Sequence, residues 1–329
     1  MPERKVVSFI DLFSGAGGLA QGFRQASDPS IEYRSVFAVE LEPSFAATYK
    51  ANFGHEVFCG PIEDVRQVDL PKADLIIGGP PCQGFSPLGK MSPTDRHPTM
   101  NKLWRHYFRI LEWVRPKAFV VENVPEFLRS DQYPRVKSEA GRLGYTVIEA
   151  VLNAAEFGVP QQRRRGFLVG VLKGTPRLPA PGPDQITATV MDAIGDLVDE
   201  PLVFDFSNGT GKSHPISTLH IGRNPTQVSL KRYKCVPPGG NRFDLMRKRP
   251  DLTPRCWLEK PTGSTDVFGR MEWGKPSLTI RTEFFKPEKG CYLHPSLHRP
   301  ITHREAARLQ TFPDDYLFCG SKLEIARQI

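Results

Sequence analysis

The chain has 329 residues, enough for one large domain or two. Hydrophobic residues make up 39% and charged residues 24%, and no apolar run reaches the roughly 18 residues that a membrane span needs. The six cysteines form no Cys-x-x-Cys pair, which argues against a disulfide framework. The N-terminus carries no signal peptide pattern, so we expect a reducing, cytoplasmic setting.

Positive charge is concentrated in one stretch of the chain. Lys and Arg number 44 against 36 Asp and Glu, a net charge of +8. Between residues 222 and 260 the basic residues are Arg223, Lys231, Arg232, Lys234, Arg242, Arg247, Lys248, Arg249, Arg255 and Lys260, against Asp244, Asp251 and Glu259. This excess is typical of a phosphate-binding surface, although a solvated basic face is an equal alternative.

The first half of the chain alternates strand-like and helix-like segments. Strands are predicted over residues 6–12, 33–39, 75–77, 118–121, 145–152 and 166–171, and helices over 17–26, 43–52 and 102–114. Repeated strand–helix units predict an α/β fold, with a mostly parallel sheet and helices on both faces. We expect this first domain to span residues 1–180.

The character of the sequence changes after a proline-rich linker near residues 176–183. Residues 181–290 are rich in Pro, Gly and Arg, and they predict a smaller second domain of irregular, β-rich character. A helix is expected from Thr302 to about Pro313, because Thr302 and Glu305 have capping-box spacing. We expect residues 291–329 to return to the first domain.

One thiol follows a stiff turn at the end of a predicted buried strand. Gly78 and Gly79 allow close backbone approach, and the two prolines that follow fix φ and remove two N–H donors before Cys82. Ligands of open α/β sheets bind outside the carboxyl ends of the strands, so Cys82 is a candidate nucleophile rather than a small core residue. Residues 83–101 show no periodicity and are a candidate lid.

Glycines and acids follow the first strands. The segment Asp11-Leu12-Phe13-Ser14-Gly15-Ala16-Gly17-Gly18 is consistent with a dinucleotide site, an S-adenosylmethionine site or a tight turn. Glu40 ends the second predicted strand, where an acid can accept hydrogen bonds from ribose hydroxyls; otherwise it is a surface carboxylate. Asp64 ends the third strand region and could accept from an adenine amino group, or serve as a routine helix cap.

Two further segments carry candidate catalytic groups. Glu122 ends the strand over residues 118–121 and could act as an acid beside Cys82. In an extended segment Arg163 and Arg165 share one face, where two guanidinium groups could stabilise a thiolate and bind a carbonyl or phosphate. The alternative is a basic surface edge. Cys291, His294 and His298 have metal-like spacing, but Pro and Gly around them indicate a loop, and we expect no metal.

In their order along the chain, these segments resemble the DNA cytosine-5 methyltransferase family, of the prokaryotic restriction–modification type. The resemblance covers nearly the whole chain except the basic middle region. Its most specific parts are Pro80-Pro81-Cys82-Gln83, Glu122-Asn123-Val124, Gln161-x-Arg163-x-Arg165 and the segment over residues 299–313. The fold that it implies is the Rossmann-like sheet of S-adenosylmethionine-dependent methyltransferases, and residues 181–290 would be a target-recognition domain.

The resemblance also implies a mechanism. The Cys82 thiolate would add to C6 of cytosine, while Glu122 would donate a proton at N3. Arg165 would contact the base carbonyl and the thiolate, and Arg163 a neighbouring phosphate or the base. The residues implied to bind S-adenosylmethionine are Phe13, Ser14, Gly15, Gly17, Gly18, Glu40 at the ribose, Asp64 at the adenine, Pro80 and Leu103.

The implied substrate is double-stranded DNA with its target cytosine flipped out of the helix, in a cytoplasmic, nucleoid-associated enzyme. A cognate restriction endonuclease would belong to the same system without forming a stable complex. The family's final motif is not apparent before Ile329, which raises the alternative of a second polypeptide that supplies it. Other readings are an RNA cytosine-5 methyltransferase acting on tRNA, a catalytically impaired DNA-binding paralogue, or a nucleotide-dependent dehydrogenase.

Overall fold

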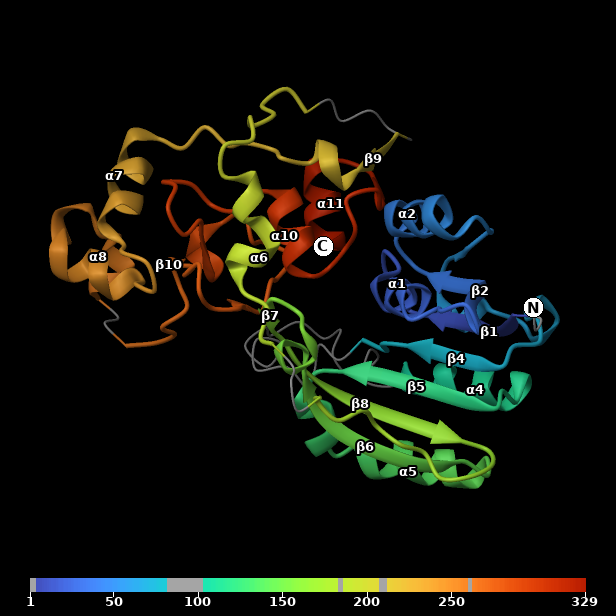
Figure 1. The fold of residues 1–329 in the computed structure, drawn as a ribbon. Coiled ribbons are helices and arrows are strands. Elements are labelled where there is room, and N and C mark those ends of the chain that lie inside the picture. The colour runs from blue at the N-terminus through green and yellow to red at the C-terminus, as the bar shows by residue number, and fades with distance from the viewer. Residues whose placement is uncertain (1–3, 82–102, 183–185, 207–211, 260–261) are drawn as a thin grey trace. The chain divides into compact units, whose positions relative to one another are not determined.

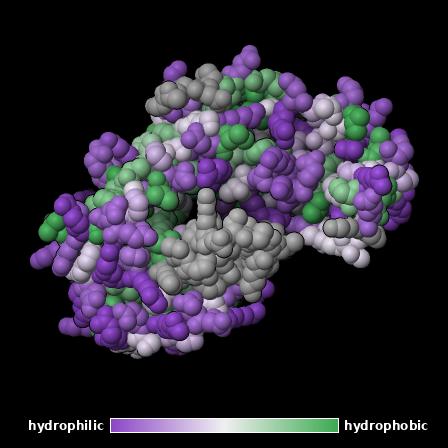
Figure 2. Space-filling model, turned by 180° about the vertical axis from the view of Figure 1, so that it is seen from behind, coloured by the Kyte–Doolittle hydropathy of each residue, from purple (hydrophilic) through white to green (hydrophobic). Residues whose placement is uncertain are grey.

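The computed structural model describes residues 4–81, 103–182, 186–206, 212–259 and 262–329 (Figure 1). Contacts divide the chain into two compact units, Met1–Asn153 with Arg164–Pro181, and Ala154–Arg163 with Gly182–Ile329. Within the described ranges, no helix combines the length and apolar character needed to cross a membrane. The face seen in Figure 2 is largely hydrophilic, with apolar residues in smaller groups.

A seven-stranded sheet forms the first unit, in the order β3-β2-β1-β4-β5-β8-β6. Its strands are β1 (Lys5–Leu12), β2 (Ile31–Glu40), β3 (Phe58–Cys59), β4 (Leu75–Gly78), β5 (Ala118–Asn123), β6 (Thr146–Asn153) and β8 (Arg164–Val171). All neighbouring pairs from β3 to β5 are parallel, whereas β8 is antiparallel to both β5 and β6. The predicted mostly parallel sheet is confirmed.

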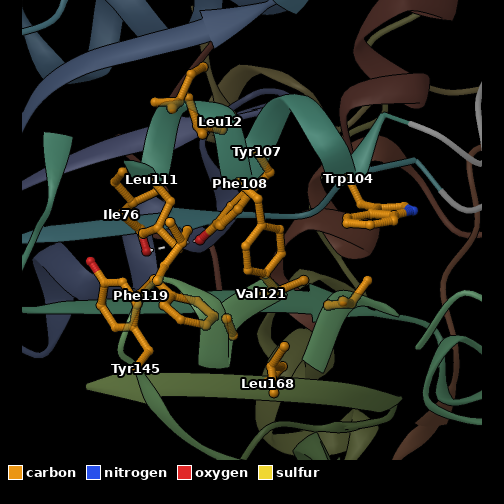
Figure 3. Packing of buried hydrophobic residues seen from close by; sticks show 14 of the residues in the cluster. Leu12, Ile76, Trp104, Tyr107, Phe108, Leu111, Phe119, Val121, Tyr145 and Leu168 are labelled. Carbon is orange, nitrogen blue, oxygen red and sulfur yellow. Dashed lines mark hydrogen bonds between the residues drawn. The ribbon is translucent and has the colours of Figure 1, made fainter. Parts of the chain in front are cut away.

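Helices cover both faces of this sheet, as predicted. They are α1 (Gly18–Gln25), α2 (Pro43–Phe53), α4 (Trp104–Val114) and α5 (Tyr133–Arg142). Alternate residues of β1 point to opposite faces, so Phe9 packs with Tyr49 of α2, whereas Ile10 and Leu12 pack with Tyr107 of α4. Figure 3 shows the second of these clusters, which is rich in aromatic rings.

The sheet is closely packed at its carboxyl edge. A Cβ at Gly78 would lie 2.2 Å from the Leu12 carbonyl oxygen, so β4 could not approach β1 in this way with any other residue. The Tyr107 hydroxyl lies 3.1 Å from the Ile76 carbonyl oxygen and 3.0 Å from that of Val120. It therefore ties α4 to β4 and β5 near the ends of these strands.

The second unit contains more helix than strand in its described residues. Its helices are α6 (Val190–Ile194), α7 (Gln227–Cys235), α8 (Arg242–Lys248), α9 (Arg255–Leu258), α10 (His303–Leu309) and α11 (Lys322–Gln328). Its strands are β7 (Gln161–Gln162), β9 (Ser213–Pro215), β10 (Gly269–Arg270), β11 (Ser277–Leu278), β12 (Cys291–Leu293) and β13 (Leu317–Cys319). The predicted irregular character holds, but β-rich does not describe residues 181–290. Short capped helices occur there instead, α7 beginning after Thr226 and α8 after Asn241.

The C-terminal segment packs within the second unit. Thr302 and Glu305 form the predicted capping box of α10, which ends at Leu309, before the expected Pro313. Thr311 then adopts a positive φ of 64°, which no α-helix accommodates. Ala306 and Leu309 of α10 are buried with Ile194 of α6 and Ala326 of α11. The contacts thus group residues 291–329 with residues 182–290, differently from the expected return to the first domain.

Candidate active site

Most of the predicted site residues that the structure describes in the first unit lie at the carboxyl edge of its sheet. Strands β2, β1, β4 and β5 are neighbours and run parallel, so their carboxyl ends meet at one edge. The strand order changes direction between β1 and β4, and open α/β sheets bind ligands in the crevice at such a point. Residues 13–18, which we call the glycine turn, follow β1. Residues 78–81, which we call the proline turn, begin with the last residue of β4 and continue beyond it.

The glycine turn has open space beside its backbone. Gly15 and Gly17 have φ values of 56° and 89°, and Phe13 adopts the left-handed region at 59°. A Cβ at Gly15 would have no heavy atom within 4 Å, which marks open space beside the backbone. Helix α1 begins directly after Gly17, so its first N–H groups face the same edge and favour negative or hydrogen-bonding groups.

Glu40 is fixed against this turn. Its Oε2 accepts a 2.7 Å hydrogen bond from the Gly15 N–H and its Oε1 a 2.9 Å bond from Glu42 N–H. Burial raises the pKa of the Glu40 carboxyl, and the backbone donors act in the opposite direction. The buried Ser14 Oγ has no hydrogen-bond partner among the described residues. Leu41, beside Glu40, is 61% exposed despite being apolar. These groups fit a nucleoside, which brings hydroxyls for the polar atoms and a ring for the leucine.

The proline turn is held by β5. Asn123 Nδ2 donates a 2.9 Å hydrogen bond to the carbonyl oxygen of the buried Pro80, and Asn123 Oδ1 accepts from the Val124 N–H at 2.9 Å. A Cβ at Gly79 would lie 3.2 Å from Glu122 Oε2, so the turn passes close to this carboxyl group. Cys82 follows Pro81 in the sequence but lies outside the described residues, as does the candidate lid of residues 83–101.

Glu122 forms an ion pair with Arg165. Arg165 Nε lies 2.9 Å from Glu122 Oε1, and both side chains are partly buried. The antiparallel direction of β8 explains the contact, because it sets the start of β8 beside the end of β5. Arg164 is exposed, as the predicted alternation requires, while Arg163 and Arg165 are half-buried. Arg163 belongs to the second unit, and its place relative to Glu122 is not described.

Two expected cofactor residues lie in other surroundings. Asp64 is in the 3-10 turn η1 (Ile62–Asp64) rather than at a strand end, because β3 stops at Cys59. It lines an open hollow with His55, Phe58 and Arg66, and no residue of the glycine turn belongs to that lining. Leu103 is half-buried against the α4 core cluster, and its carbonyl oxygen accepts from the His106 N–H.

Sequence reasoning gave no structural role to two residues of this edge. Asn123 belongs to the Glu122-Asn123-Val124 motif, but its hydrogen bond to the Pro80 carbonyl oxygen depends on how β5 lies beside the segment after β4. Asp11 stands out in the sequence only as the start of the glycine segment, yet it is a fully buried carboxyl group at the end of β1. A charged residue inside an otherwise apolar strand was the signal that could have singled it out.

No cluster suited to a metal ion occurs among the described residues. Burial raises the pKa of the Cys291 thiol to about 12, so a thiolate ligand is disfavoured there. Nδ1 of the buried His294 accepts hydrogen bonds from the N–H groups of Ser296 and Leu297. These contacts give His294 a structural role in its loop.

The sheet order, with the glycine turn after β1 bound to the acid that ends the neighbouring strand β2, is that of a Rossmann-like α/β fold, which solved methyltransferases share. The solved structure of a DNA modification methyltransferase encoded within an E. coli prophage superposes with a TM-score of 0.69 at 25% identity, covering 98% of this chain and 93% of that one. The structure of S. pombe Dnmt2 methyltransferase shares the fold, with a TM-score of 0.60 at 18% identity over 98% of this chain and 93% of that one.

Sequence comparison is more specific. The family described as C-5 cytosine-specific DNA methylase matches residues 7–329. Type II methyltransferase M1.HphI of Haemophilus parahaemolyticus is 32% identical over 98% of this chain and 82% of its own length. Type II methyltransferase M.XorII of Xanthomonas oryzae pv. oryzae is 34% identical over 97% of this chain and 80% of its own length. The chain belongs to the C-5 cytosine-specific DNA methylase family and is a DNA cytosine-5 methyltransferase.

Proposed function

We propose that this enzyme transfers a methyl group from S-adenosylmethionine to C5 of a flipped-out cytosine in a specific duplex sequence, through a covalent bond between Cys82 Sγ and cytosine C6. The observation that carries the proposal is the Glu122–Arg165 ion pair beside the proline turn. An acid, a guanidinium group and the turn that leads into a cysteine meet at one edge of the sheet, where such sheets bind ligands.

Each residue has a defined part in this reaction. The Cys82 thiolate adds to C6, which breaks the C5=C6 double bond and makes C5 nucleophilic. In the protonated state Glu122 delivers its proton to ring N3, so the negative charge that develops on the base is neutralised and Glu122 is left as the carboxylate that pairs with Arg165. Arg165, held by Glu122, provides donors for the base carbonyl. After the methyl group is on C5, water accepts the C5 proton and N3 returns its proton to Glu122, which restores the C5=C6 double bond and expels the Cys82 thiolate.

S-adenosylmethionine, when bound, supplies the electrophilic methyl group. The structural support for its site is the glycine turn with Glu40. The Glu40 carboxylate would accept from the ribose hydroxyls, the unpartnered Ser14 Oγ would gain a partner, and the exposed Leu41 would cover an apolar surface of the nucleoside. Pro80 lines the same edge of the sheet. Asp64 faces a separate hollow, so the structure gives no support to its assignment at the adenine.

Covalent trapping tests the proposal directly. Random-sequence DNA amplified with 5-fluoro-deoxycytidine triphosphate contains every short site, and fluorine cannot leave C5 as the proton does. With S-adenosylmethionine, the enzyme should form a stable adduct whose DNA-linked peptide contains Cys82. Omitting the methyl donor should prevent stable trapping.

The Cys82→Ser variant is the matched control and should give no adduct, while its far-UV circular dichroism and DNA binding stay unchanged. An adduct on another residue, or methylation by Cys82→Ser at the wild-type rate, would exclude Cys82 as nucleophile. A parallel reaction with fluorinated tRNA should give no adduct. Efficient trapping on tRNA instead of DNA would transfer the same chemistry to an RNA substrate.

A further inference from the structure

The second unit contains a hollow that the proposed chemical steps do not use. Its volume is about 220 Å³, and all the residues that line it belong to this unit. The side chains that bear on recognition are those of Gln162, Asp266, Glu272, Lys275 and Leu278. The hollow therefore offers two acids, a lysine, an amide and an apolar surface to whatever enters it.

The covalent chain bounds the distance from this hollow to the catalytic groups. Gln162 of β7 precedes Arg165 by three residues, so their Cα atoms are at most about 11 Å apart. Leu278 of β11 pairs with Gln162, and Thr279 Oγ1 donates a 2.8 Å hydrogen bond to the Gln162 carbonyl oxygen. Successive nucleotides of a DNA strand rise about 3.4 Å, so the hollow is within about four base pairs of the base that Arg165 contacts in the proposed mechanism.

The turn that carries Glu272 and Lys275 is held in place by its backbone. The carbonyl oxygens of Lys275 and Trp273 accept hydrogen bonds of 2.9 and 3.0 Å from the first two N–H groups of α6. The Glu272 side chain lies over the backbone of Gly239, where an added Cβ would be 2.7 Å from Glu272 Oε1. The hollow therefore presents these two side chains from a fixed framework.

Glu272 and Lys275 form an ion pair that a ligand can open. Lys275 Nζ lies 2.7 Å from Glu272 Oε1, and the side chains of Lys275 and Glu272 are 67% and 36% exposed. An exposed pair of this kind contributes little to stability, so exchanging its partners costs little. Asp266, the other acid of the hollow, is already bound by Arg281 and Ser264. Glu272 is therefore the acid that is better placed to accept from a ligand.

A carboxylate beside an ammonium group is the complement of one base pair. In the major groove, cytosine presents its N4 amino group, from which Glu accepts, and guanine presents O6 and N7, to which Lys donates. A C·G pair offers both groups side by side. A backbone phosphate offers only acceptors and negative charge, which the Glu272 carboxylate would repel. The pair therefore suits a base edge better than a phosphate.

We infer that Glu272 and Lys275 are specificity-determining residues that together read one C·G base pair within about four base pairs of the target cytosine. Glu272 accepts from the N4 amino group of the cytosine in that pair, and Lys275 donates to O6 or N7 of its guanine. The inference rests on the proposed methylation of a specific duplex sequence. It adds which residues select one position of that sequence and which base pair they select.

Bisulfite sequencing of methylated random-sequence duplex DNA tests the inference. The wild type, incubated with S-adenosylmethionine, should select a C·G pair at a fixed position near the methylated cytosine. Glu272→Gln should lower that preference about tenfold and shift it toward A·T, because a glutamine amide matches the N6 and N7 atoms of adenine. Lys275→Gln should weaken selection at the same position, and both variants should leave the other positions of the site unchanged.

Glu288→Gln is the matched control, since Glu288 is an exposed acid of the same unit outside the lining of the hollow, and it should leave every position unchanged. Unchanged selection in both test variants, an equal loss at all positions, or effects at two separate pairs would overturn the inference. If Glu272→Gln does not fold, Lys275→Gln decides alone, because its side chain is largely exposed. A wild type that methylates no DNA would contradict the proposed function, whereas one that methylates DNA without selecting a nearby C·G pair would contradict only this inference.

Discussion

Asn123 fixes the geometry of the active-site edge without being a reactive group. Its side-chain amide donates to the Pro80 carbonyl oxygen on the neighbouring segment and accepts from the N–H of Val124, the residue that follows β5. The residue next to it, Glu122, faces the reacting base in the proposed mechanism. In the proposed mechanism, two adjacent residues of one motif therefore have separate roles, one in chemistry and one in holding the turn that precedes Cys82.

Asn123→Ala should reduce methylation more than it reduces DNA binding. The variant leaves the buried Pro80 carbonyl without its donor, which costs about 1–3 kcal/mol of stability or is relieved by movement of the turn. We expect at least a tenfold lower single-turnover rate, with the DNA Kd within about twofold of the wild type. Rates and filter binding measured on the same preparation check this. An unchanged rate would show that the turn keeps its position without Asn123.

At the scale of elements, the antiparallel direction of β8 relative to β5 determines which residues of β8 reach the active-site edge. A parallel strand in this position would bring its carboxyl end to the edge, whereas β8 brings its first residues there and so places Arg165 against Glu122. Along an extended strand, neighbouring side chains alternate between faces. This alternation separates Arg165, which pairs with Glu122, from the exposed Arg164.

Arg165→Ala and Arg164→Ala form a matched pair that tests this arrangement. Arg165→Ala removes the partner of Glu122 and a donor to the base, and should lower the methylation rate at least about 100-fold. Arg164→Ala removes an exposed side chain and should change the rate by less than about twofold. Single-turnover assays at saturating DNA give both rates. Equal losses in the two variants would contradict the assigned strand geometry.

The sequence predicted the elements of the first unit well because their apolar strands are bounded by Gly, Pro and charged residues. The short helices α7 and α8 were missed, because they are polar and rest on local caps and tertiary packing rather than on a long apolar periodicity. At the site, the motifs singled out Glu122 and Arg165 as candidates, and the structure brings these two side chains together. Their pairing depends on two strands that only the fold brings together.

For the whole molecule, the basic stretch of residues 222–260 is less uniform than its composition suggests. Each of its three acids pairs with an arginine: Asp244 with Arg247, Asp251 with Arg249 and Glu259 with Arg255. Lys231 and Lys234 on α7 are exposed and have no ion-pair partner among the described residues. They are therefore the better candidates for contacts with DNA phosphates.

Replacing Lys231 and Lys234 by Gln should weaken DNA binding in a salt-dependent way. For each lysine that binds a phosphate, its replacement should reduce the slope of log K against log salt by about 0.9, and binding should weaken similarly for all sequences. Arg247→Gln, which removes a cation already paired with Asp244, is the control and should change the slope less. Fluorescence anisotropy over a range of salt concentrations measures these slopes. Equal slopes for all variants would place the phosphate-binding residues elsewhere.

The division of the chain into two units has a consequence for dissecting the enzyme. The polypeptide passes between the units three times, after Asn153, after Arg163 and after Pro181. The excursion Ala154–Arg163 belongs to the second unit, and Arg164, at its end, begins the strand that carries Arg165. No single cut can therefore release either unit whole. A fragment ending at Pro181 would keep Gln161 but lose two of its partners. The short strand that contains Gln161 pairs with Ser277, and the Gln161 side-chain amide donates to the Leu309 carbonyl oxygen.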